Sequence, residues 1–153
     1  MKIVYERVVK AQEIVVSPRP IWKCRTCQMF GKGPSCPPDV PSWEEARKWI
    51  NSFESALVAK FGIERDAFEE EKRSVLEYLL KKEKMFFSEG NPFALSLFSG
   101  NCNLCDECKV KNGGRCSYPT KVRPSVDAIG IEIGSIAKID FNEDVLYGLI
   151  LID

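Results

Sequence analysis

The feature that most constrains this chain is the segment GNCNLCDECKVKNGGRCSYP at residues 100–119, which holds four of the seven cysteines. Three of them follow the spacing C-x2-C-x2-C, and the fourth comes after seven more residues. Successive C-x2-C steps are typical of a tight turn that wraps thiolates around iron and sulfide. The segment therefore predicts a metal site made by Cys102, Cys105, Cys108 and Cys116.

The spacing departs from that of bacterial ferredoxins, in which three residues precede the fourth cysteine and a proline follows it directly. Here seven residues precede Cys116, and Ser117 and Tyr118 separate it from Pro119. Zinc sites more often use separated C-x2-C pairs or histidine, and this chain has no histidine. Ligation by thiolates alone favours an iron-sulfur cluster, most simply [4Fe-4S], with zinc as the alternative.

Two glycines in the same segment, Gly113 and Gly114, have two interpretations. Positive φ angles there would let the loop double back and offer backbone N–H groups to sulfur, which would tune the potential of a cluster. The alternative is an ordinary surface turn.

A second cysteine set lies in WKCRTCQMFGKGPSCPP, where Cys24, Cys27 and Cys36 have the spacing C-x2-C-x8-C. Three thiolates leave one position for Asp39, solvent or a substrate, and an open position is what catalytic metal sites keep. Alternatively, a partner chain completes the site, or one or two of these thiols are simply buried. The spacing is not the C-x3-C-x2-C of radical S-adenosylmethionine enzymes.

The residues around both sets would shape such sites. Pro37 and Pro38 restrict the backbone directly after Cys36, which would hold a ligand loop in one conformation. Three aromatic residues flank the cysteines and either shield clusters from water or belong to the core: Trp22, Phe30 and Tyr118.

Composition places the chain among ordinary globular proteins, with 44% apolar and 29% charged residues. A chain of 153 residues can bury its own core, so one metal-binding domain spanning residues 1–153 is expected. The 22 basic residues balance the 22 acidic ones, which argues against nucleic acid as a partner. No apolar run approaches a membrane span, and the N-terminus does not resemble a secretion signal.

These observations predict a cytoplasmic protein, in which clustered thiols are more often metal ligands or redox groups than disulfides. The absence of histidine excludes Ser-His-Asp and Cys-His catalysis, and GKGPS at 31–35 lacks the phosphate-loop pattern. No catalytic residue can be assigned, and whether the chain is an enzyme stays open.

Apolar patterns predict an α+β or α/β fold, one small sheet covered by helices with the cysteine loops at one edge. The proline-rich segment 18–41 has no apolar period and is expected to be an ordered loop. Ser42 with Glu45, and Asp66 with Glu69, form capping patterns ahead of two helices. The expected strands are two within 2–17, one at 55–63 and a central one at 145–153. The expected helices are 43–53, a long one from Asp66, 92–98 and one after Ser125.

On the long helix, Glu69 would pair with Arg73 and the charge-rich FEEEKR segment would face solvent. Arg123 has two interpretations. It would either pair with Asp127 one turn along a helix, or place its fixed charge near a reduced cluster or an anionic substrate.

Together, KCRTCQMFGKGPSCPP, GNCNLCDECKVKNGGRCSYP and RPSVDAIGI resemble the predicted metal-binding proteins catalogued as domain of unknown function 2284, common in anaerobic bacteria and archaea. The resemblance extends from about Trp22 to the end of the chain. It implies metal binding, with all seven cysteines as ligand candidates, and no particular reaction. It also makes Arg123, Ser125 and Asp127 part of a family signature, in which glutamate is usual at the last position.

Three functions fit these observations. The first is a small [4Fe-4S] protein that carries electrons to a redox partner protein. The second is an interaction domain braced by zinc, which chelators would loosen. The third is an enzyme or metal-delivery protein that works at an under-coordinated cluster on Cys24, Cys27 and Cys36. The sequence leaves a homo-oligomer open as well.

Overall fold

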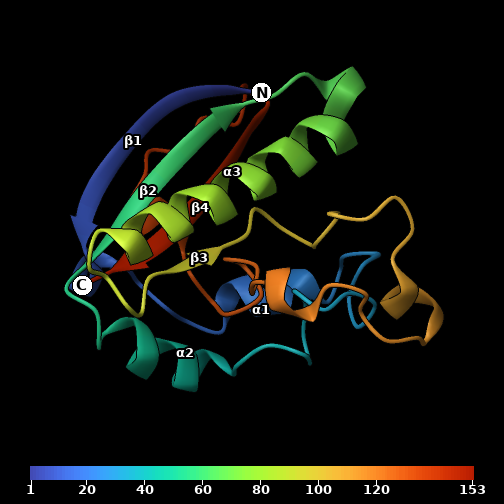
Figure 1. Cartoon of the computed structure of the whole chain (residues 1–153), viewed down its shortest axis with the longest axis horizontal. Helices are drawn as coiled ribbons and strands as arrows, with labels where there is room; N and C mark the ends of the chain where they lie inside the picture. The colour runs from blue at the N-terminus through green and yellow to red at the C-terminus, as the bar shows by residue number, and fades with distance from the viewer.

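An antiparallel sheet forms the centre of the computed structural model, which describes residues 1–153 (Figure 1). Its four strands lie in the order β1-β2-β4-β3. They are β1 (Lys2–Lys10), β2 (Ser55–Gly62), β3 (Leu95–Leu97) and β4 (Val145–Ile152). With helices packed on this sheet the fold is α+β, and the closing strand β4 is an inner strand, as its apolar sequence predicts.

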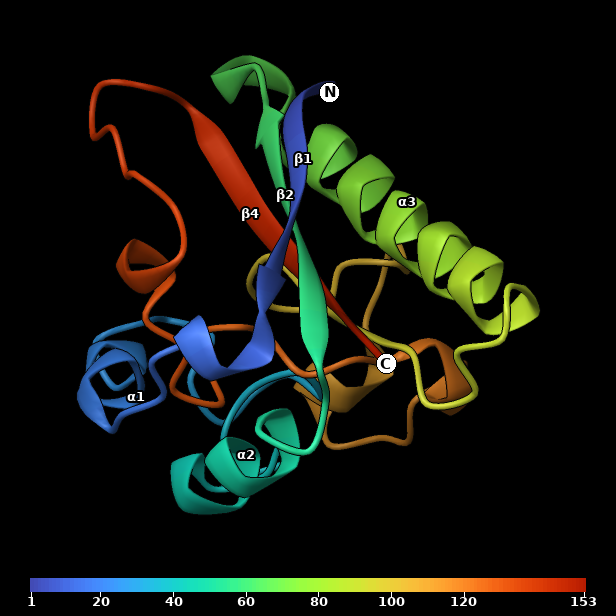
Figure 2. The ribbon, with the colours of Figure 1, turned by 90° about the vertical axis from the view of Figure 1, so that its left-hand side faces the viewer.

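The inner strands bury side chains on both faces of the sheet. Alternate residues of β2 belong to different cores: Val58 to one, Leu57 and Phe61 to the other. The long helix α3 (Phe68–Ser88) covers one face with Val75, Leu76 and Leu79, whereas α2 (Trp43–Ile50) lies against the opposite face (Figure 2).

Two of the expected helix starts can be compared with the structure. Ser42 caps α2, since its hydroxyl accepts the Glu45 N–H and the Glu45 carboxylate accepts the Ser42 N–H. That capping box is confirmed. The predicted cap at Asp66 is wrong, because Asp66 lies in a 3-10 turn and α3 begins at Phe68 without a side-chain cap.

Elsewhere the local pattern misleads. Residues 14–17 form no second strand, since only Val16 makes an isolated bridge, to Ile131, and β1 pairs with β2 instead. Segment 92–98 is not a helix but contains β3. The segment after Ser125 is a series of turns rather than a helix.

The predicted loop 18–41 does contain a short helix, α1 (Arg19–Cys24). Two prolines introduce it, which suits the first turn of a helix because proline lacks an N–H group. No helix of the fold combines the length and apolar character that crossing a membrane requires.

Candidate metal centre

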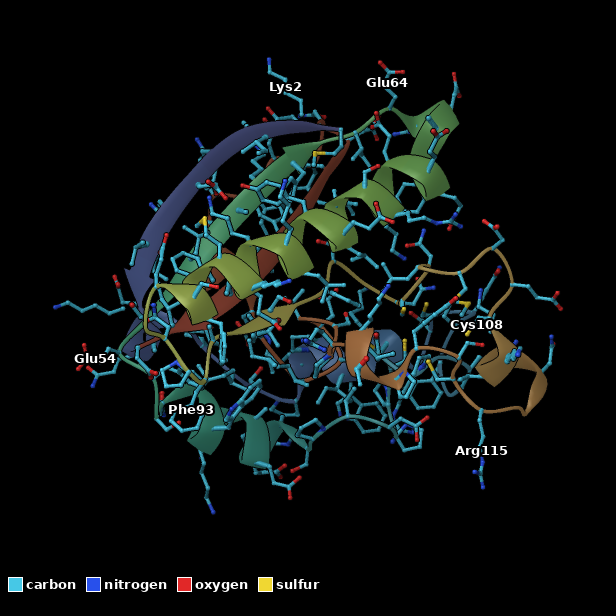
Figure 3. All side chains as sticks on the ribbon, in the orientation of Figure 1. Lys2, Glu54, Glu64, Phe93, Cys108 and Arg115 are labelled. Carbon is cyan, nitrogen blue, oxygen red and sulfur yellow. The ribbon has the colours of Figure 1, made fainter.

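The two cysteine-bearing loops lie at the same end of the molecule, beyond the sheet (Figure 1). The Ser125 N–H donates to the Ser35 carbonyl at 3.0 Å, which ties the C-terminal loop to the residue before Cys36. Figure 3 shows Cys108 within a group of sulfur atoms, while Arg115 extends away from the protein. All seven cysteines are free thiols.

The N-terminal set, Cys24, Cys27 and Cys36, is built on α1 and the turns that follow it. Cys24 ends α1, and its carbonyl accepts the Cys27 N–H at 2.9 Å. Cys36 is 9% exposed, whereas Cys27 is exposed to solvent. The Met29 N–H donates to Cys27 Sγ at 3.4 Å. A backbone donor of this kind stabilises a thiolate.

Burial and neighbouring negative charge suppress ionisation of Cys24 and Cys36. Burial raises the pKa of Cys24 to about 11, helped by the nearby Asp127 carboxylate and the Cys36 and Cys27 thiols. Burial also raises the pKa of Cys36. These thiols are therefore protonated near neutral pH without a cation, and a metal would displace their protons on binding.

The C-terminal set, Cys102, Cys105, Cys108 and Cys116, is partly exposed. Cys102 packs against the core beneath α3. Burial raises its pKa, opposed by a hydrogen bond from the Leu104 N–H, and the other three thiols lie close enough to raise it further. The four thiols are thus near neighbours.

The paired glycines of the C-terminal loop form a turn. Gly113 has a φ of 80° and ends the 3-10 turn Lys109–Asn112. Its N–H donates to the Val110 carbonyl, and the Gly114 N–H donates to the Lys109 carbonyl. Both N–H groups are engaged by backbone oxygens, so the surface-turn interpretation describes them.

Neither set is arranged for a single metal ion. No three Cys, Asp or Glu side chains converge tightly enough to hold one. Tetrahedral zinc with bonds of about 2.3 Å needs its sulfurs about 3.8 Å apart. A polynuclear cluster would place its own iron and sulfide between the thiolates, so its ligands need not converge on a single point.

The two sets meet at Lys72 of α3. This side chain is 3% exposed and forms no ion pair with a carboxylate. Its Nζ donates to the Asn101 side chain. Burial lowers the pKa of Lys72, while Glu69, Cys36 and Cys102 are near enough to favour its charged form. A buried ammonium group without an ion-pair partner calls for negative charge nearby.

The prediction that the FEEEKR segment faces solvent is wrong for Lys72, which is buried. The signal was present, however. Lys72 precedes Val75, Leu76 and Leu79 by three, four and seven residues, which places it on the buried stripe of α3. Arg73, expected to pair with Glu69, instead forms an ion pair with Asp106 of the C-terminal loop at 2.6 Å.

The predicted pairing of Arg123 with Asp127 is wrong. Arg123 binds Glu83 of α3 through two hydrogen bonds of 2.9 and 2.6 Å, and both side chains are mostly buried. Because the segment after Ser125 is not helical, positions 123 and 127 do not share a helix face. The guanidinium therefore anchors the end of the C-terminal loop to α3.

A pocket of about 860 Å³ opens beside the N-terminal set. Its lining includes Cys24, Cys27, Cys36 and Asp127. Asp127 is accessible from the pocket although protein surrounds most of it, and this burial raises the pKa of its carboxyl. Asp39, the ligand suggested by the sequence, is exposed and does not line the pocket.

The flanking aromatic residues lie at the surface rather than in the core. Trp22 is 65% exposed, with the Arg25 guanidinium 4.5 Å from its ring centre. Phe30 also faces Arg25, and Tyr118 lies beneath Lys121. The interpretation of these rings as core residues is therefore wrong.

Comparison with known protein families identifies a match. The sequence pattern of the family described as "Predicted metal-binding protein (DUF2284)" matches residues 7–142, which include all seven cysteines. No curated protein and no solved structure matches the chain.

Proposed function

This chain belongs to the DUF2284 family of predicted metal-binding proteins, and we propose that it is an iron-sulfur protein that carries electrons. Cys102, Cys105, Cys108 and Cys116 would hold a [4Fe-4S] cluster, and Cys24, Cys27 and Cys36 would hold a second centre. Such clusters supply a one-electron couple whose potential depends on charge, hydrogen bonds and solvent around the sulfurs.

The observation that carries this proposal is the meeting of the two thiol sets around Lys72. Cys36 and Cys102 both act on its charge, and no carboxylate pairs with it. Thiolate-bound clusters are net anions, so a buried ammonium between them would compensate their charge and favour their reduced states. Two centres placed this close would also let an electron enter at one and leave at the other.

The surroundings of the sulfurs suit exchange with another protein. Cys27 and the C-terminal thiols are within reach of solvent, while Cys36 is buried. We propose a redox partner protein that docks at this end of the molecule. The cytoplasm is the compartment we propose, because its thiol-reducing systems keep cysteines available as ligands.

The first test is the metal content of protein purified without oxygen. We expect about four irons with equal acid-labile sulfide for one cubane, and about eight for two centres of this size. The visible absorption should bleach with dithionite and return on oxidation. Zinc without labile sulfide, even after anaerobic reconstitution, would refute the redox function and leave the thiols as a structural brace.

Replacing Lys72 with methionine tests the charge argument, because methionine keeps most of the volume and removes the ammonium group. We expect the reduction potential to become more negative, since reduction adds charge that Lys72 no longer compensates. A dye-mediated redox titration measures this.

The matched control is Lys111→Met, because Lys111 also acts on Cys36 but is exposed. Solvent and salt screen an exposed charge, so its removal should shift the potential much less. Equal shifts in the two variants would show that the burial of Lys72 has no special role.

A further inference from the structure

We propose that the Asp127 carboxylate is the fourth protein ligand of the centre on Cys24, Cys27 and Cys36. The proposal rests on the proposed function only in requiring a metal centre on these three thiols. It replaces Asp39, the candidate nearest in sequence, with a residue more than ninety positions away from Cys36.

The backbone holds Asp127 in place beside the thiols. Two residues earlier, the Ser125 N–H donates to the Ser35 carbonyl at 3.0 Å, next to Cys36. Three residues later, the Gly130 carbonyl accepts the Ser17 N–H at 2.8 Å, just before α1. The loop that bears Asp127 is thus fixed at both ends to the segment that bears the cysteines.

The approach at Gly130 is too close for any side chain. Gly130 has a φ of 89°, and a Cβ there would clash with the Ser17 carbonyl oxygen. The glycine therefore permits the contact that brings this loop against the start of the N-terminal cysteine segment.

The pocket geometry selects Asp127 over Asp39. Asp127 lines the same pocket as the three thiols, and its charge reaches Cys24. Asp39 does not line that pocket. Four side chains stand around a space of about 860 Å³, which leaves room for a core of several irons.

Asp127 also lacks a cation of its own. It forms no ion pair, and the two arginines nearest in the chain and the pocket are engaged elsewhere: Arg123 with Glu83, and Arg19 with Glu132. No cation of the protein therefore lies within ion-pair distance of the Asp127 carboxylate. Iron bound beside it would supply that positive charge, and carboxylate oxygen is an established iron ligand.

A carboxylate differs from a fourth thiolate in its consequences. It is a harder and more weakly held ligand for cluster iron, so one iron would exchange more easily than the other three. Because Asp127 lines the pocket, a small molecule with an oxygen or sulfur donor could reach an iron that this carboxylate would hold.

The experiment compares Asp127→Ala, Asp127→Cys and the control Asp39→Ala, all as full-length chains purified without oxygen. Iron and sulfide per chain and the EPR spectrum of the oxidised protein are measured, with thermal unfolding to verify folding. For Asp127→Ala we expect a loss of about one iron per chain and the signal of a three-iron cluster. Asp127→Cys should retain all its iron, and Asp39→Ala should match the wild type.

The outcomes separate this proposal from the function. An Asp127→Ala protein with wild-type iron and spectrum would overturn the ligand assignment alone, and so would iron loss in Asp39→Ala. Suppose instead that the folded wild-type protein holds a single cluster and that Cys24→Ser contains the same amount of iron. That result would overturn both the second centre and its proposed ligand. If Cys24→Ser removed the C-terminal cluster, the assignment of Cys24 to a separate N-terminal centre would be contradicted.

Discussion

Replacing Cys105 with serine is expected to remove the C-terminal cluster entirely, lowering iron from about eight to about four atoms per chain if both centres are present. Cys105 is the middle thiol of the C-x2-C-x2-C turn, and this loop has little regular structure of its own to hold the other three thiols in place once one ligand is lost. A serine hydroxyl remains protonated near neutral pH and is a poor ligand for cluster iron. Iron and labile-sulfide assays measure the effect.

The same change should loosen the C-terminal loop. Between Asn101 and Val122 the only regular elements are two short 3-10 turns, Lys109–Asn112 and Pro119–Lys121. Metal binding would therefore supply much of the order in this segment, and its loss should speed amide hydrogen exchange there. The sheet, whose inner strands are buried on both faces, should remain protected.

Ser117→Ala is the matched control, because it alters the residue next to Cys116 without touching a thiol. It should keep the wild-type iron content and exchange pattern. A Cys105→Ser protein that retains all its iron, with unchanged protection of the loop, would show that Cys105 is not a ligand.

The sequence predicts those parts of the fold whose signals are local. Two predictions of this kind are confirmed: the capping box at Ser42 and Glu45, and the closing strand at 145–152, whose residues are apolar on both faces of the sheet. Each is indicated by neighbouring residues alone. The pairing of β1 with β2 is not local, because it joins residues about fifty positions apart. Two β-branched runs therefore suggested a hairpin that the chain does not form.

Segment 92–98 shows how a local pattern was misinterpreted. Pro92 and the apolar residues after it suggested a helix, but Leu95, Ser96 and Leu97 alternate as a strand does. The fully buried Ser96 is satisfied by Glu83 of α3, which accepts from both its N–H and its hydroxyl at 2.6 Å. A partner distant in sequence thus stabilises the strand.

For the candidate site, the sequence indicated the thiols but not their surroundings. Cysteine spacing can be recognised from the sequence alone, so both sets could be proposed as metal ligands without a structure. Lys72 and Asp127 matter only because α3 and the loop after Ser125 bring their charges to the thiols. Such contacts depend on tertiary packing, which residue spacing does not encode.

The buried ion pair between Arg123 and Glu83 predicts the largest loss of stability. Arg123 also donates to the Thr120 and Val122 carbonyls, and Glu83 accepts from Ser96. Arg123→Met would leave a mostly buried carboxylate with only Ser96 as its donor, and would free the end of the C-terminal loop. We expect the free energy of unfolding to fall by about 3–5 kcal/mol, measured by urea denaturation.

The loss should depend on pH in a defined direction. Burial alone would raise the pKa of Glu83, but hydrogen bonds from Arg123 and Ser96 outweigh it and hold the pKa below 4.5. Because the pKa of Glu83 is lower in the folded protein than in the unfolded chain, its ionised carboxylate stabilises the fold at pH values above the pKa of the unfolded chain. That contribution disappears as the pH falls through the pKa of the folded protein. Without Arg123 the carboxyl of the variant protonates more readily, so its deficit should be largest near neutral pH and shrink toward pH 4.

Arg65→Met is the control, because Arg65 forms an ion pair with Asp144 at a similar distance, 2.7 Å, but is 81% exposed. Solvent screens an exposed pair and leaves it a small net contribution, so this variant should lose little stability at any pH. Equal losses in the two variants would mean that burial adds nothing to the Arg123 pair. If Arg123→Met lost more unfolding free energy at pH 4 than at pH 7, the depressed pKa of Glu83 would be contradicted. Such a result would mean that the buried carboxyl destabilises the variant more when it is protonated than when it is charged.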